Sequence, residues 1–326
     1  MRRLDGTLIA AVVVGALLLA APFYYAPYRV EQIASALVLA IIVLGLGILT
    51  GFSGQISLGH SAFVGIGAYI AAILIKDHGW PYLATIPVAG AVCLGAGIVV
   101  GLPALRLRGL HLALVTLAFA AVFPAMLRRF DGLTHGNRGI RLDDATAPKW
   151  TGLADDQWVY MVVLVIAAAL FLFARNVIRS RVGRSMIAVR DDEIAAQAAG
   201  INVARVRTLA FGLSALFAGV AGALETLLVG AVVPSSFGVL PSIGYVVGLV
   251  IGGVGSLVGP LIGGFAIHFL PRWAADINVQ LSGVLYGGLL IALTYIAPDG
   301  IVGLGHRARR LLSSRPANQG DTNEGP

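Results

Sequence analysis

Long, uninterrupted runs of apolar residues constrain this chain more than any other feature of its sequence. Residues 9–21 and 160–174, for example, contain no charged side chain. A transmembrane β-barrel would alternate apolar and polar residues, whereas a helix satisfies its own backbone in lipid and tolerates contiguous apolar runs. With 58% hydrophobic and only 12% charged residues, the chain has too little polar surface for a soluble fold. We therefore predict an all-α polytopic membrane protein.

Ten segments approach the roughly 20 apolar residues that a membrane-spanning helix needs. They are residues 8–26, 33–50, 60–75, 84–102, 110–127, 158–174, 208–230, 242–254, 256–271 and 281–297. We interpret the first as an uncleaved helix and not as a signal peptide, because its apolar run continues through Phe23 and Tyr25. The pairs within 33–75 and 242–271 are short and rich in glycine, which predicts broken Gly-rich helices near a pathway.

Basic residues are distributed unevenly over the segments that join these spans. If both termini are cytoplasmic, the cytoplasmic segments contain fifteen Lys and Arg residues and the outer segments contain eight. This bias follows the positive-inside rule and explains the net charge of +7 without a nucleic-acid partner. We thus predict a single transmembrane domain over residues 1–305, with a cytoplasmic loop at 175–207 and an outer loop at 128–157. The polar tail at 306–326 is expected to be cytoplasmic and disordered.

Ten spans divide into two halves of five, and an odd number makes the second half enter the membrane from the opposite side. That is the geometry of an inverted repeat. The third and eighth spans would correspond, and each follows a stretch rich in glycine and serine, at 51–59 and 234–238. We therefore predict two inverted five-helix halves.

The sequence lacks the motifs of the common catalytic sites. It has no phosphate-binding G-x-x-x-x-G-K-[ST] loop, no Cys/His cluster with metal-ligand spacing and no G-x-S-x-G nucleophile context. Its one cysteine, Cys93, lies in an apolar run and forms no intrachain disulfide. We expect a non-catalytic chain that binds no metal and no cofactor. Only one carboxylate, Glu225, falls inside a predicted span, which argues against an ion-driven pump with several proton relays.

Polar residues follow the second predicted span at a depth where lipid offers no hydrogen bonds. Irregular or polar segments are tolerated there only against protein or a water-filled cavity. One interpretation is that Ser57 or Ser61 caps the third helix. The other is that these residues line a pathway, and the two are compatible. The residues assigned to a substrate pathway are Gln55, Ser57, His60, Ser61 and Glu225.

Glycines recur every four residues in the eighth and ninth predicted spans. Such a row lets two helix backbones approach closely. It is also typical of the short or broken helices that line a pathway. The residues assigned to helix packing are Gly244, Gly248, Gly252, Gly255, Gly259 and Gly263.

The loop at 175–207 contains the signals of a short helix. Asp191 or Asp192 can cap its start, residues 193–199 are strong helix formers, and Gly200 suits a left-handed stop. The flanking arginines would also suit an anionic membrane surface, but the alanine-rich face buries little apolar area, so we favour a groove in a partner protein. The residues assigned to this docking element are Arg190, Asp192, Glu193, Ala195, Ala196, Ala199 and Gly200, with Arg205 flanking it. For the outer loop at 128–157, docking of a soluble partner and simple covering of the bundle both stay open.

Five blocks of sequence, in order, resemble the branched-chain amino acid ABC transporter permeases, in particular the LivM-type subunit. They are GFSGQISLGHSAFVGIGAYIAAIL from Gly51, LRLRGLHLALVTLAFA from Leu105, LTHGNRGI from Leu133, GRSMIAVRDDEIAAQAAGIN from Gly183, and PSSFG with GGVGSLVGPLIGG from Pro234 and Gly252. Two positions depart from the pattern of that family, which commonly has an aromatic residue near the position of Glu225 and a glycine at the position of His135.

The resemblance implies a subunit of an importer in the bacterial inner (cytoplasmic) membrane. A second permease would complete the channel, two ATP-binding-cassette subunits would hydrolyse ATP, and a periplasmic or lipid-anchored binding protein would deliver substrate. The coupling loop of the family maps onto residues 192–202. Family substrates are chiefly leucine, isoleucine and valine, and related members carry other amino acids, urea or short amides. A secondary transporter without ATPase partners is the alternative class.

Overall fold

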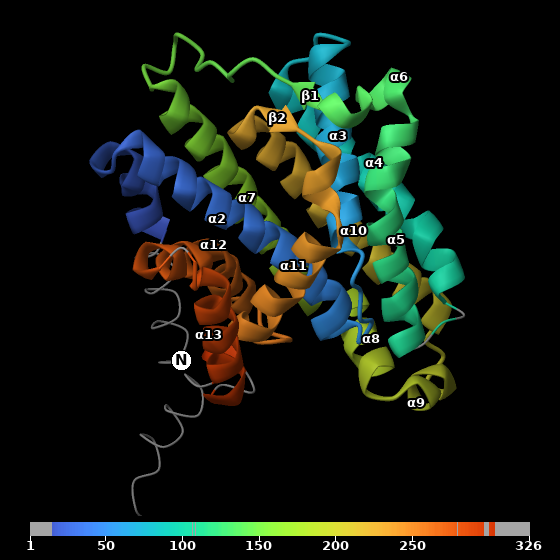
Figure 1. Ribbon diagram of the computed structural model, residues 1–326. Coiled ribbons are helices and arrows are strands. Elements are labelled where there is room, and N and C mark those ends of the chain that lie inside the picture. Colours follow the sequence, from blue (N-terminus) through green and yellow to red (C-terminus); the bar gives the residue numbers. More distant parts are fainter. Residues whose placement is uncertain (1–14, 106, 108, 279, 297–299, 304–326) are drawn as a thin grey trace, which may run out of the picture.

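The computed structural model describes residues 15–303, apart from positions 106, 108, 279 and 297–299. The start of the first predicted span and the tail at 306–326 lie outside the described residues. Apart from one short pair of strands, the described secondary structure is helical (Figure 1). The long elements are helices Gly15–Tyr24, α2 (Pro27–Leu46) continued by the π-helix η1 (Gly47–Phe52), α3 (His60–Lys76), α4 (Tyr82–Ala104), α5 (Leu110–Arg129), α7 (Asp155–Arg179), α10 (Val203–Val229), α11 (Val239–Gly252), α12 (Gly259–Ile277) and α13 (Ser282–Ile296).

Five of the described helical segments are long and apolar enough to cross a membrane. They are Pro27–Phe52, Tyr82–Pro103, Leu110–Arg129, Asp155–Arg179 and Val203–Val229. The chain is therefore an all-α membrane protein, as predicted. The remaining predicted spans fall on shorter helices or on helices such as α12 that do not meet the same criteria, so a count of ten is not established by helix length.

The second helix differs from its predicted bounds of 33–50. It begins at Pro27, whose fixed φ suits the first helical position, and it runs without a break to Phe52, for 26 residues. In the most apolar 18-residue stretch of Pro27–Phe52, 78% of the stretch is buried, and the value for α10 is 72%. In α7 only 22% of the corresponding stretch is buried. These two helices therefore form the centre of the bundle, and α7 lies at its periphery.

Two helices are interrupted where the sequence is rich in glycine and serine. After Phe52 the chain is non-helical until α3 begins at His60. After α10, Gly230 adopts a left-handed φ of 65°, and strand β2 (Ala231–Val232) and the 3-10 turn η3 (Pro234–Phe237) precede α11. We call residues 53–59 the first break and residues 230–238 the second break.

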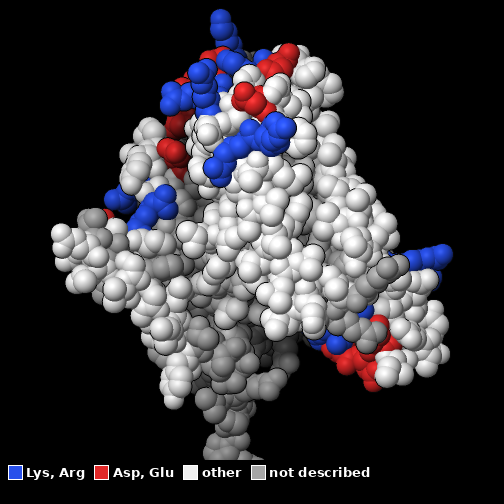
Figure 2. Space-filling view, turned by 45° about the vertical axis from the view of Figure 1, so that its right-hand side comes forward, with Lys and Arg blue, Asp and Glu red and all other residues white. Residues whose placement is uncertain are grey.

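The bundle has two distinct ends, which Figure 1 shows at its top and bottom. At one end, strand β1 (Ile140–Arg141) pairs antiparallel with β2 of the second break, next to the short α6 (Asp131–Thr134) and η2 (Gly136–Arg138). At the other end lie α8 (Arg181–Asp191) and α9 (Glu193–Ala198). We call these the sheet end and the α9 end. On the face shown in Figure 2, charged side chains gather at both ends and leave a largely uncharged flank between them, as a bilayer requires.

Glycines outside the predicted rows make the closest packing in the centre. A Cβ added at Gly222 of α10 would lie 2.0 Å from the Val64 carbonyl oxygen of α3, and one at Gly67 would lie 2.2 Å from the Gly219 oxygen. Side chains cannot occupy such gaps, so these glycines allow the backbones of α3 and α10 to touch. This crossing was not predicted from the sequence.

Candidate functional site

The two breaks place two helix N-termini against each other inside the bundle. Ser61, in the first turn of α3, donates its backbone N–H to Ser242 Oγ of α11 at 2.9 Å, and the two hydroxyls are also 2.9 Å apart. Ser61 Oγ donates to the Gly238 carbonyl of the second break at 2.7 Å. Both serines are completely buried. We call this pair the serine junction, and it joins the start of α3, just after the first break, to the second break and to the start of α11.

The predicted cap of the third helix is wrong. Gly59 occupies the N-cap position and has no side chain that could cap the helix. Ser57 Oγ accepts only a long bond of 3.4 Å from the Gly59 N–H, and Ser61 lies inside the helix. The Leu58 N–H is satisfied from another element, by Thr116 Oγ1 of α5 at 2.9 Å. Tertiary contacts thus replace the local cap.

The structure does not gather the five pathway residues into one site. Gln55 belongs to the α9 end, Ser61 forms the serine junction, and Ser57 lies in the first break, where among the described residues its hydroxyl bonds only to the Gly59 N–H. His60 turns its Nε2 toward the packed crossing of α2 and α10, near Gly45. Glu225 lies 18 residues from Arg207 along α10, which separates them by about 27 Å. One carboxylate oxygen of Glu225 is enclosed and has no hydrogen-bond partner among the described residues.

The segment between α7 and α10 folds into two short helices whose ends are capped locally. Ser180 Oγ accepts from the Val182 N–H at the start of α8. Asp192 accepts from the N–H groups of Ile194 and Ala195 at 2.9 and 3.0 Å, so Asp192 and not Asp191 caps α9. Gly200 has the left-handed φ, 82°, that the sequence predicts for the stop. The first of these helices, α8, is absent from the predicted elements.

Arg190, at the end of α8, connects this segment to the first break. Its Nη1 donates to the Gly51 carbonyl, at the end of the π-helix, at 2.8 Å. Its side-chain stem packs where a Cβ on Gly54 would lie, at 2.8 Å from Cγ. A helix C-terminus leaves carbonyls unsatisfied, and Arg190 supplies one of them with a charged donor. The guanidinium also pairs with Asp191 at 2.7 Å.

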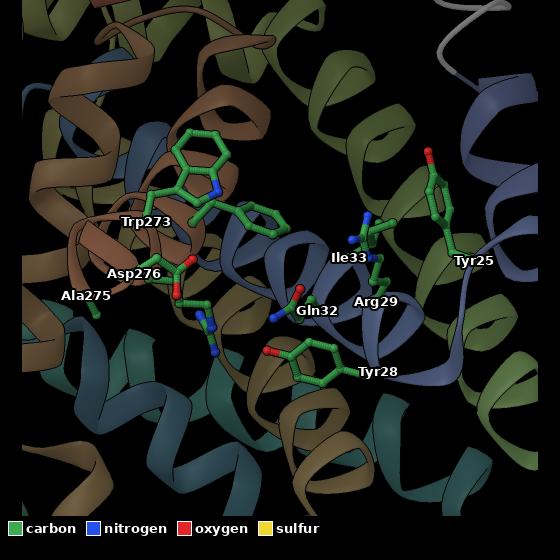
Figure 3. A pocket seen from close by; sticks show the side chains of 10 residues that line it. Tyr25, Tyr28, Arg29, Gln32, Ile33, Trp273, Ala275 and Asp276 are labelled. Atoms are coloured by element: carbon green, nitrogen blue, oxygen red, sulfur yellow. The ribbon is translucent and has the colours of Figure 1, made fainter. Parts of the chain in front are cut away.

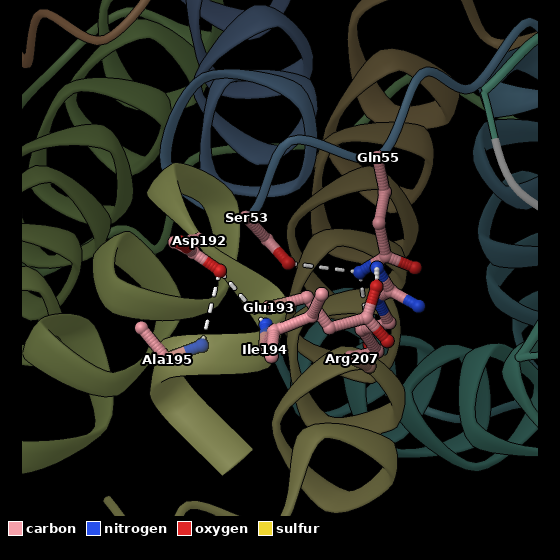
Figure 4. A network of polar contacts seen from close by, with 7 residues as sticks. All are labelled: Ser53, Gln55, Asp192, Glu193, Ile194, Ala195 and Arg207. Carbon is pink, nitrogen blue, oxygen red and sulfur yellow. Dashed lines mark hydrogen bonds and ion pairs between the residues drawn. The ribbon is translucent and has the colours of Figure 1, made fainter. Parts of the chain in front are cut away.

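A second set of contacts runs from α9 to the first break through Arg207 (Figure 4). Glu193 pairs with Arg207 Nη2 at 2.9 Å, and both side chains are largely buried. Gln55 Nε2 donates to the Arg207 carbonyl at 3.2 Å and to Ser53 Oγ at 2.9 Å. The arginine that pairs with Glu193 is therefore Arg207, which follows the predicted flanking residue Arg205 in the first turns of α10.

Only part of α9 faces outward. Ile194 is 80% exposed, and Ala195 and Ala199 are exposed beside it. Ala196, assigned to docking from the sequence, is buried against Val189 and Val203 in a small cluster of its own. Ala196 thus holds α9 onto α8 and α10 and does not present itself to a partner. Ile194 was missed because a six-residue helix shows too little periodicity to reveal its outer face.

The glycine rows lie where α11 and α12 cross. A Cβ added at Gly252 would lie 2.0 Å from the Gly259 oxygen, and one at Gly263 would lie 2.1 Å from the Gly248 oxygen. Gly244 and Gly255 do not belong to this contact. A Cβ on Gly244 meets no described atom within 4 Å, and Gly255 is in the turn after α11 with a φ of 84°. Gly255 instead packs against η1, because a Cβ added at Gly51 would lie 2.7 Å from the Gly255 backbone nitrogen, so of the assigned glycines only Gly244 makes no close contact among the described residues.

His135 adopts a backbone conformation that favours glycine. Its φ of 57° makes it the one non-glycine residue with a positive φ in the described part of the chain. Such a conformation is strained for residues with a Cβ. Its Nε2 lies 3.6 Å from Asp77, at the end of α3. His135 thus contacts the C-terminal end of α3 from the segment that carries β1.

These features define a class of protein. Interrupted helices that meet inside an apolar bundle are the architecture of membrane transport proteins. In the described residues, no three His, Cys, Asp or Glu side chains converge to hold a metal ion.

The chain belongs to the family of branched-chain amino acid transport system permease components, whose model matches residues 28–294. The chain is 30% identical to the high-affinity branched-chain amino acid transport system permease protein LivM of Escherichia coli (strain K12), over 86% of this chain and 71% of LivM. It is 26% identical to LivH of the same organism, over 81% of this chain and 91% of LivH. It is also 26% identical to BraD of Pseudomonas aeruginosa, over 86% and 96% of the two chains. No solved structure matches the chain. The family predicted from the sequence blocks is thus confirmed.

Proposed function

We propose that the chain is a membrane-spanning permease subunit of an ATP-driven importer of branched-chain or other hydrophobic amino acids. It works beside a second permease, two ATP-binding-cassette subunits that use the ATP, and a periplasmic or lipid-anchored binding protein. It catalyses no reaction and binds no cofactor itself. The names of LivM, LivH and BraD, which all denote branched-chain amino acid transport, support the substrate class.

The observation that carries this proposal is the connection between the exposed face of α9 and the first break. Arg190 bonds to Gly51, and Glu193 bonds through Arg207 to Gln55. An ATPase subunit that moves α9 would therefore pull on the polypeptide just before the serine junction. A secondary transporter has no need of an exposed docking helix connected in this way.

The α9 end is assigned to the cytoplasm, together with both termini, and the sheet end to the periplasm. The membrane domain occupies residues 1–305, with a tail at 306–326. The breaks support ten membrane segments in two inverted halves. Helices α3 and α11, of 17 and 14 residues, start together at the serine junction and run apart. Helix α3 runs to Asp77 beside His135, and α11 runs to the turn beside Arg190. Discontinuous helices in corresponding positions of two halves mark the transport site in such folds, so Ser57, Ser61 and Glu225 stay assigned to the pathway.

Uptake into proteoliposomes tests the function. The chain is co-reconstituted with the permease, ATPases and binding protein that accompany it, and labelled leucine is supplied outside. We expect accumulation that requires internal ATP and that unlabelled valine or isoleucine suppresses, while urea and acetamide do not. Uptake that persists without ATP would identify a secondary transporter. Suppression by urea, and not by valine, would overturn the substrate class.

Cysteine accessibility tests the assignment of the two ends. The only native cysteine, Cys93, is buried, so it gives a low background. In Lys149→Cys, at the sheet end, an impermeant maleimide added to intact cells is expected to react. In Gln197→Cys, on α9, it should react only after the membrane is permeabilised. The reverse labelling pattern would place the sheet end in the cytoplasm and the α9 end in the periplasm, contrary to the proposal.

A further inference from the structure

A cavity on the flank of the bundle lies apart from both breaks and from α9. It has a volume of about 570 Å³ and lies between the first turns of α2 and the last turns of α12. Figure 3 shows Tyr28, Arg29 and Gln32 on the α2 side and Trp273 and Asp276 on the α12 side. Its size is that of an ordinary ligand site, and neither the transport pathway nor the coupling contacts use it.

The walls of this cavity offer two opposite charges. The Arg29 side chain has no hydrogen bond or ion pair among the described residues, and the Asp276 side chain on the opposite wall has none either. Arg272, one turn before Asp276, donates one guanidinium N–H to the His268 carbonyl at 2.7 Å. Its other N–H groups make no hydrogen bond among the described residues and can bind a ligand. A ligand that fits therefore carries an oxyanion for a guanidinium and a cationic amine for the carboxylate.

The surroundings place the cavity at the boundary between membrane and water. Tyr25, Tyr28 and Trp273 line it and are all at least half exposed. Tyrosine and tryptophan gather at this level because one end of each side chain is apolar and the other is polar. The cavity is also open: Tyr28 is 68% and Trp273 59% exposed, whereas a site for a small solute encloses most of its ligand.

An aromatic track leads from the cavity along α12. Phe269 and Trp273 line the cavity, and their rings are 6.0 Å apart. Phe265 continues the row one turn further, stacked on Phe269 with centroids 6.0 Å apart. These residues follow at intervals of four and so share one face of the helix. Such a stripe, starting at a polar cavity, matches an acyl chain below its headgroup.

We infer that this cavity binds a zwitterionic aminophospholipid, with its phosphate at the guanidinium of Arg29 or Arg272 and its primary ammonium at Asp276. One acyl chain lies along the aromatic track, against Phe269 and then Phe265. A free amino acid has the same pair of charges, but it has no chain to occupy the track and would be poorly enclosed. The inference is independent of the transported substrate.

Quenching of tryptophan fluorescence by lipids brominated in their acyl chains tests this site. The protein complex is placed in phosphatidylcholine nanodiscs that contain brominated phosphatidylethanolamine or brominated phosphatidylglycerol with the same chains. The signal of Trp273 is obtained by difference from Trp273→Phe. We expect brominated phosphatidylethanolamine to quench Trp273 at a concentration about threefold or more below that needed for phosphatidylglycerol. A preference of this size is what one partly exposed ion pair provides.

Two variants and one control assign the charges. Asp276→Asn is expected to abolish the preference for ethanolamine, and Arg29→Gln to weaken quenching by both lipids. Arg129→Gln, an exposed arginine on α5 outside the cavity, should change neither. Equal quenching by both lipids in the unmodified protein would show that the cavity contacts only non-selective annular lipid. Relief of quenching by millimolar leucine would show that the cavity binds a small zwitterion and not a lipid. Either result overturns the inference, whatever the outcome of the uptake assay.

Discussion

Replacing Ala199 by arginine is expected to abolish substrate-stimulated ATP hydrolysis by the assembled transporter. Ala199, the C-cap residue of α9, is exposed beside Ile194 and Ala195 and forms one outer face with them. In our proposal this face is buried in a groove of the ATPase subunit. An unpaired charge buried there costs several kcal/mol, which corresponds to a loss of affinity of more than tenfold. The measurement is ATPase activity of the reconstituted complex with and without loaded binding protein, together with co-purification of the ATPase.

A small neutral substitution provides the matched control. Ala199→Ser adds one hydroxyl at the same exposed position and should leave co-purification and stimulation intact. Membrane insertion should be the same in both variants, because α9 lies outside the apolar segments. If Ala199→Arg keeps full stimulation and full co-purification, α9 does not dock the ATPase, and the interpretation as a helix on the membrane surface gains support.

A second comparison separates docking from transmission. Arg190→Ala removes the bond to the Gly51 carbonyl but leaves the outer face of α9 unchanged. The ATPase is therefore expected to co-purify with this variant, while uptake per ATP hydrolysed falls.

The elements that depend on neighbouring residues were the most predictable. Apolar blocks locate the helices, and the cap of α9 by Asp192 and its stop at Gly200 involve groups within one turn of each other. Even here the bounds of α2 were wrong, because a sequence pattern does not show that a proline begins the helix six residues earlier. The face of α9 also escaped prediction, since Ala196 is buried only by residues of α8 and α10.

The candidate site depends on pairings between distant parts of the sequence, which no local signal contains. Ser61 and Ser242 are 181 residues apart, and Arg190 and Gly51 are 139 apart. The polar residues of the first break were identified because polar groups are rare at membrane depth. Their partners were not identified, because the sequence around a serine in an apolar run does not show which distant helix contacts it. The same holds for Gly67 and Gly222, which lie in no regular row.

Replacing Gly252 by alanine is expected to impair assembly more than any other single-methyl change in the glycine rows. The added Cβ would lie 2.0 Å from the Gly259 carbonyl oxygen and 2.5 Å from its carbon. Both atoms belong to the backbone, so no side-chain rotation relieves the clash and the two helices have to separate. Overpacking of this kind costs about 1–3 kcal/mol, occasionally more. The measurement is the yield of folded protein and its thermal unfolding midpoint in detergent.

Gly244, on the same helix, supplies the control. Alanine there meets no described atom within 4 Å, and alanine is favoured over glycine in a helix by about 1 kcal/mol. Gly244→Ala should therefore match or exceed the unmodified protein in stability, although both variants add the same methyl group to α11. If the two variants unfold at the same temperature, close contact of α11 and α12 is not what these glycines provide. A normal yield of Gly252→Ala with an altered substrate preference would instead assign the glycine row to the wall of the pathway.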